Sequence, residues 1–91
     1  MPEFQARITV AGLPIRDTAR WEPFRDALER EHANLGPTLS WRTGVLVVAL
    51  AADCDDQAEA AAVTIAAVTD SLRAAGLGAL YPAVIELEPV D

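Results

Sequence analysis

Residues 45–52, with the sequence VLVVALAA, carry no polar side chain on either face of an extended strand. Side chains alternate between the two faces of a strand, so a strand with one wet face shows alternating apolar and polar residues. This segment does not alternate. It therefore predicts a central strand, and it leaves open which set faces away from the core: Val45, Val47 and Ala49, or Leu46, Val48 and Leu50.

The segments before this strand predict a first strand and a first helix. Residues 3–10 alternate between apolar and polar side chains, which is the period of a half-buried strand. An apolar stripe at helical spacing predicts a helix over about 23–34, with Pro23 in the first turn, where its missing N–H is harmless. Residues 17–21 then form a turn that leads into this helix.

Two more strands complete the predicted sheet. Leu39 and Trp41 mark the inner face of a short strand, which a tight turn at residues 42–44 joins to the segment described first. The last strand lies within residues 81–90 and is bracketed by prolines, which suit an edge position. The side chains expected to point inward from it are Ala83, Ile85 and Leu87.

A second helix begins within residues 53–60 and closes at Gly76. Asp56 and Glu59, three residues apart, predict a capping box at its start. Thr64 is expected to face water, together with Asp70 and Arg73. The predicted buried stripe consists of Ala61, Ile65, Val68, Leu72 and Ala75.

The predicted order is strand, helix, strand, strand, helix, strand, in a chain of 91 residues that has room for one core. Right-handed crossovers place the first and third strands at the centre of the sheet, with both helices on one face. The prediction is therefore an α+β fold, a ferredoxin-like βαββαβ sandwich with a four-stranded antiparallel sheet, in a single domain over residues 1–91.

The charge balance argues against some partners. Fourteen acidic residues stand against seven arginines and no lysine, for a formal net charge of −7. Nucleic-acid affinity depends on cationic contacts to phosphate, and anionic membranes attract basic segments. We therefore expect neither nucleic acid nor membrane as a partner. No apolar run reaches the length of a membrane span and no signal segment opens the chain, so a cytoplasmic protein is expected.

The sequence offers little for metal or cofactor chemistry. Cys54 is the single cysteine and His32 the single histidine, so no metal framework and no internal disulfide is predicted, and no cofactor is expected. The carboxylates around Cys54 are interpreted as a helix cap, and they oppose a reactive thiolate by like charge. His32 is interpreted as a side chain near the end of the first helix, where the helix dipole favours it.

One loop is a candidate anion site. Gly12, Arg16, Arg20 and Trp21 lie between the first strand and the first helix, where a loop glycine, arginines and a helix N-terminus can hold phosphate. Acylphosphatases use this position with an arginine and a supporting asparagine. Here Thr43 stands where that asparagine would be, so nothing orients an attacking water and phosphatase chemistry is not expected.

Two functional hypotheses follow. The first is a small non-catalytic interaction or regulatory module that self-associates as a homodimer through its open sheet face or edge, because an apolar strip with a polar rim is typical of an interface. The second is a small-molecule or anion-binding domain, or a minor enzyme, with its site at residues 12–21. The candidate interface residues, with the outward set still open, are Val45, Leu46, Val47, Val48 and Leu50.

Overall fold

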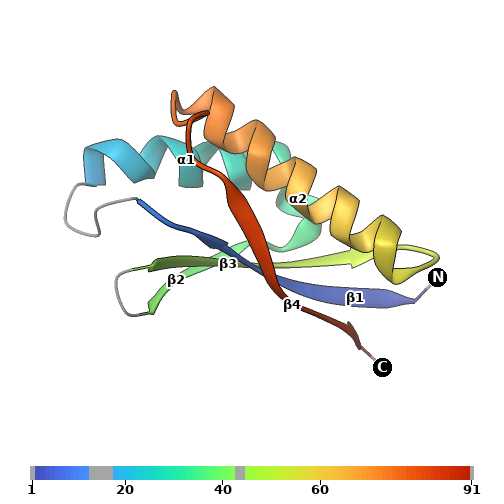
Figure 1. Ribbon diagram of the computed structural model, residues 1–91. Coiled ribbons are helices and arrows are strands. Elements are labelled where there is room, and N and C mark those ends of the chain that lie inside the picture. Colours follow the sequence, from blue (N-terminus) through green and yellow to red (C-terminus); the bar gives the residue numbers. More distant parts are fainter. Residues whose placement is uncertain (1, 13–17, 43–44, 91) are drawn as a thin grey trace.

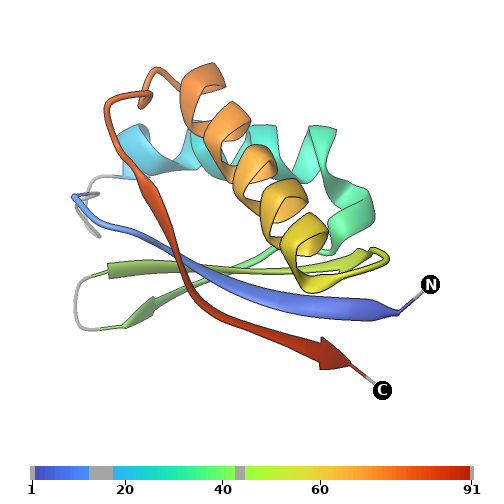
Figure 2. The ribbon, with the colours of Figure 1, turned by 45° about the vertical axis from the view of Figure 1, so that its right-hand side comes forward.

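The computed structural model describes residues 2–12, 18–42 and 45–90, with the side chains of Thr18, Arg20, Val84 and Ile85 outside that description. It forms two layers, a twisted sheet and a pair of helices that both lie on one side of it (Figure 1). The second view shows the opposite side of the sheet without a helix over it (Figure 2). The elements are β1 Glu3–Val10, α1 Thr18–Glu31, a 3₁₀ turn η1 Ala33–Leu35, β2 Thr38–Arg42, β3 Val45–Asp53, α2 Gln57–Ala74 and β4 Pro82–Val90.

The described strands pair in the order β2-β3-β1-β4. Each neighbouring pair is antiparallel, and the long central pair matches Glu3 with Asp53 at one end and Val10 with Leu46 at the other. The predicted α+β class, with an antiparallel sheet and two helices, is confirmed. The predicted turn at residues 42–44 lies outside the described residues except for Arg42.

The alternation of β1 is confirmed. Phe4, Ala6, Ile8 and Val10 are buried, and the residues between them are exposed or half-buried. The even-numbered side chains of β1 therefore face the helices, and the odd-numbered ones face the side of the sheet that no helix covers.

In β4 the pairing register shifts by one residue. Arg7 pairs with Glu86, but Ile8 pairs with Val84, so β4 carries an irregularity between these positions. Such a bulge moves the residues beyond it to the opposite face. Ala83 is consequently exposed, and the prediction that it points inward is wrong, whereas Leu87 packs against the core as predicted.

The first helix begins earlier than the sequence pattern predicts. α1 starts at Thr18 and contains Pro23, which the prediction had placed in the first turn. Part of the predicted lead-in turn, Thr18 to Trp21, is therefore helical. Proline in a helix loses only one backbone hydrogen bond, the one to the residue four positions earlier, so the helix continues through it at some cost in stability.

The buried face of α2 is rotated from the predicted stripe. Thr64 and Ser71 are fully buried, although Thr64 was predicted to face water. Their hydroxyls donate to the carbonyl oxygens of Ala60 and Ala67, each at 2.9 Å. Because each hydroxyl is satisfied within its own helix, these small side chains can be buried without an unpaired polar group.

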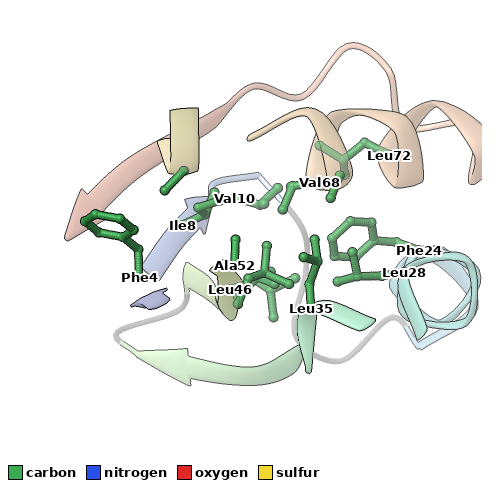
Figure 3. Close-up of a cluster of buried hydrophobic side chains, with 14 of the residues drawn as sticks. Phe4, Ile8, Val10, Phe24, Leu28, Leu35, Leu46, Ala52, Val68 and Leu72 are labelled. Carbon is green, nitrogen blue, oxygen red and sulfur yellow. The ribbon is translucent and has the colours of Figure 1, made fainter. Parts of the chain in front are cut away.

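The core lies between the helices and the sheet. Phe24 and Leu28 of α1 and Val68 and Leu72 of α2 reach down toward the strands (Figure 3). Phe4 closes the core at the end of the sheet near the N-terminus of β1 (Figure 3). The strand residues beneath the helices, with exposed fractions of at most 1%, are Ala6, Ile8, Val10, Leu46, Val48 and Leu50.

Candidate functional site: the open face of the sheet

The structure resolves which side of β3 faces away from the helices. Leu46, Val48 and Leu50 belong to the core, so they cannot form an interface with another molecule, and this half of the candidate set is corrected. Val45 and Val47 lie on the other side. The open face is made by alternating residues of the strands: Glu3, Gln5, Arg7, Thr9, Thr38, Ser40, Arg42, Val45, Val47, Ala49, Ala51, Asp53, Ala83, Glu86, Glu88 and Val90.

Small polar side chains flank the centre of the open face. Val47 pairs with Thr9 on one side and with Ser40 on the other. Although no helix lies over it, Val47 is only 5% exposed. The apolar strip along β3 is therefore largely buried, with half-buried Val45, Ala49 and Ala51 completing it.

The rim of the open face is charged. Nη1 of Arg7 donates to Oε2 of Glu86 at 2.7 Å, which links β1 to β4. The hydroxyl of Thr9 donates to the carbonyl oxygen of Ala83 at 3.2 Å, on the same pair of strands. Arg42 lies at the opposite edge, at the end of β2, and is exposed. An apolar centre within a polar rim is the arrangement that protein interfaces use.

The predicted anion site is only partly visible. Gly12 has φ +92°, a conformation that favours glycine, and a Cβ there would lie 3.2 Å from Cδ2 of Leu80. Arg16 lies outside the described residues, and of Arg20 only the backbone within α1 is described. The described residues therefore do not bring an arginine side chain to Gly12, and the anion site stays a prediction.

Trp21, the fourth residue of that prediction, lies in a groove between α1 and the edge strand β2. Its ring meets the ring of Trp41 edge to face, with centroids 5.9 Å apart. The guanidinium carbon of Arg25 lies 5.6 Å from the centre of the Trp21 ring, a cation–π contact. The groove has a volume of about 450 Å³. Its other lining residues are Glu29, Pro37, Thr38 and Leu39.

Sequence reasoning missed Arg25 and Glu29 as groove residues. They follow Trp21 at intervals of four, so they lie on one face of α1 beside it. This spacing was the available signal. The same spacing is also ordinary for a solvated helix face, so it did not by itself indicate a groove. Arg25 does make such surface contacts, because its Nη2 lies 3.4 Å from carboxylate oxygens of both Glu22 and Asp26.

A second groove, of about 580 Å³, lies where β3 leads into α2. Cys54 lines it, and the thiol is buried. Burial raises the pKa of this thiol, and the carboxylates of Glu59 and Asp53 raise it further. Cys54 is therefore a protonated, unreactive thiol near neutral pH, in agreement with the like-charge argument.

The predicted helix cap is present at this end of α2. Oδ1 of Asp56 accepts from the backbone N–H of Glu59 at 2.8 Å. The return bond differs from a standard capping box, because the Glu59 carboxylate accepts from the N–H of Asp55 rather than from that of Asp56. His32 is half-buried at the end of α1, and its Nε2 is enclosed without a hydrogen-bond partner among the described residues.

Comparison of the chain with protein-family models, with curated proteins and with solved structures gave no match. Within residues 2–12, 18–42 and 45–90, neither helix combines the length and the hydropathy needed to cross a bilayer. The function therefore has to be argued from the geometry of the open face and of the two grooves.

Proposed function

We propose that this protein is a ferredoxin-like, non-catalytic interaction module of the cytoplasm that self-associates as a homodimer through the open face of its sheet. The observation that carries the proposal is the one-sided layering: α1 and α2 both cover one side of the sheet, and the open face has no helix over it (Figure 2). The strand order β2-β3-β1-β4, with a helix after β1 and after β3, supports the ferredoxin-like assignment.

The side chains of the open face suit sheet-on-sheet packing. Near its centre they are short: Thr9, Ser40, Val47, Ala49 and Ala51. Two sheets pack face to face at about 10 Å when short side chains fill the space between them. Since Val47 is already 5% exposed in one copy, its further burial adds little free energy. We therefore expect a reversible dimer that depends on protein concentration.

Light scattering over about a hundredfold range of concentration tests this proposal, because mass action shifts a reversible dimer with dilution. The mass is expected to rise toward that of two chains. In Val47→Asp, a charge at the centre of the open face should keep the protein monomeric. The matched control is Val63→Asp on the exposed side of α2, where the side chain is 38% exposed. A wild-type mass that stays at one chain throughout contradicts the proposal.

A second candidate function is a small-molecule site, and the groove beside Trp21 favours it. Its paired aromatic rings and the Arg25 guanidinium suit a flat anionic ligand. The sequence-based prediction adds Gly12, Arg16 and Arg20 to this site, and of these Arg16 and the side chain of Arg20 lie outside the described residues. Inorganic phosphate and benzoate are the probes: a rise in melting temperature that is lost in Arg16→Ala or Arg25→Ala supports this site. An unchanged melting temperature at millimolar probe contradicts it.

A further inference from the structure

Arg42 lies at one corner of the open face, and Glu86 and Glu88 lie toward the opposite corner. Two further carboxylates, those of Glu3 and Asp53, lie opposite each other at the end of the two central strands. Arg42 pairs with Val45 at one edge of the sheet, whereas Glu86 at the other edge pairs with Arg7, which in turn pairs with Ala49. The two corners are separated by three strand spacings across the sheet and four residues along it, or about 20 Å. Arg42 is therefore too far from Glu86 to form an ion pair within one copy.

The acidic corner has capacity for a further cation. Oε2 of Glu86 accepts from Arg7, whereas Oε1 accepts no hydrogen bond from the described residues. Glu88 lies two residues further along β4, is exposed, and has no ion pair among those residues. A carboxylate can accept from two guanidinium groups, so a second arginine can bind here beside Arg7.

We propose that two copies pack open face to open face with their strands crossing near a right angle, so that Arg42 of each copy lies against Glu86 and Glu88 of the other. This inference rests on the proposed self-association. A two-fold axis in the plane of the interface, running at about 45° to the strands from Thr38 toward the Pro82 end of β4, exchanges the Arg42 corner with the acidic corner. Orthogonal packing is an established class of sheet stacking, and one arginine and one glutamate side chain together span about 10 Å between the sheets.

Other symmetric arrangements do not form this pair. An axis parallel to the strands places Arg42 over the end of β4 near Ala83, and an axis across the strands places it over Thr38. An axis along the other diagonal stacks Arg42 on Arg42 and Glu86 on Glu86, which is repulsive. For a chain with a net charge of −7, the arrangement that forms two ion pairs is favoured over one that brings like charges together.

A mixing experiment with two charge-reversed variants tests the arrangement. Arg42→Glu alone sets a new carboxylate against Glu86 of the other copy, and Glu86→Arg alone sets a new guanidinium against Arg42 of the other copy. Each variant should therefore dimerise at least about tenfold more weakly than the wild type. Mixed together, they restore an attractive pair at each corner. Native mass spectrometry of an equimolar mixture should consequently show a heterodimer fraction well above the half expected from random pairing.

The controls separate this inference from the proposed self-association. Arg73→Glu on α2 should dimerise as the wild type does. If circular dichroism shows that Glu86→Arg is unfolded, Glu88→Arg is used in its place, because this substitution leaves the contact between Arg7 and Glu86 intact. A wild-type protein that is monomeric overturns both proposals. A wild-type dimer whose charge-reversed variants dimerise normally and mix at random overturns the orthogonal arrangement alone.

Discussion

The two sides of β3 carry similar side chains in different surroundings. On the inner side, Leu46, Val48 and Leu50 lie beneath the helices and are at most 1% exposed. On the open side, Val47 has no helix over it and is still only 5% exposed. Its cross-strand neighbours within the same sheet are Thr9 and Ser40. A side chain of an all-apolar strand can therefore be buried even on the side of the sheet that no helix covers.

The difference between the two sides lies in what happens when a charge is introduced. A carboxylate at Val48 would be enclosed by the core, whereas one at Val47 can reach water above the open face. We expect Val48→Asp to abolish cooperative folding, since an unpaired buried charge costs more than the whole stability of a small domain. Val47→Asp should keep a cooperative thermal transition by circular dichroism. If Val48→Asp also folds cooperatively, the comparison is wrong.

Truncating side chains tests the same difference between the two sides of β3 with smaller losses of stability. Leu46→Ala should lower the free energy of unfolding by about 2–5 kcal/mol, because it leaves a cavity in the core. Val45→Ala, next in sequence but on the open side, should cost less than about 1 kcal/mol. Urea denaturation of both variants measures the difference. Equal losses would show that the half-buried Val45 is as tightly packed as Leu46.

Cys54 extends the inner row by two residues beyond Ala52 and provides a pH test of burial. Burial, and then Glu59 and Asp53, raise the pKa of its thiol above the ordinary value of 9.0. In the folded state the Cys54 thiol therefore keeps its proton at pH values at which the same thiol loses it in the unfolded chain. The stability from this group is fully present below about pH 9 and decreases as the pH rises above it.

The melting temperature of the wild type should consequently fall more steeply between about pH 8 and about pH 10 than that of Cys54→Ala, which lacks the titrating group. Differential scanning fluorimetry of the two proteins in parallel measures this. Parallel pH profiles would show that the thiol titrates equally in both states and is not buried as described.

The smallest expected effect is on the open side. The Arg7–Glu86 pair is 2.7 Å long, but its side chains are 35% and 51% exposed, so water screens it. Arg7→Gln should cost less than about 1 kcal/mol in the free energy of unfolding, and less at high salt. Urea titrations at low and high salt measure this. A loss of several kcal/mol would mean that the open face is as tightly organised as the core.

Much of the fold could be predicted from hydrophobic periodicity. The half-buried period of β1 and the apolar run of β3 indicated the central strands correctly, and the cap at Asp56 was recognised from its spacing with Glu59. The errors have local causes. The early start of α1 was hidden by Pro23, and the inward position of Thr64 depends on a hydroxyl bond within its own helix.

The candidate site was less accessible to sequence reasoning. The residues of β3 could not show which set faces outward, because both sets are aliphatic and only the position of the helices distinguishes them. The position of Ala83 depends on the register shift in β4, and no pattern in the sequence predicted that shift. The positions of Arg42 and Glu86 on the open face depend on the pairing of strands that are distant in sequence. The sequence alone therefore did not predict that these two residues lie at opposite corners.

The central claim is that a second copy covers the open face, and the accessibility of that face tests it most directly. Ala49→Cys in a Cys54→Ala background places one thiol on the open face, and Val63→Cys in the same background places one on α2 as a control. Alkylation by iodoacetamide is then followed in dilute and in concentrated protein. We expect the reaction at residue 49 to slow several-fold as the dimer forms, while the rate at residue 63 stays unchanged. Equal rates at residue 49 across the concentration range would contradict the claim.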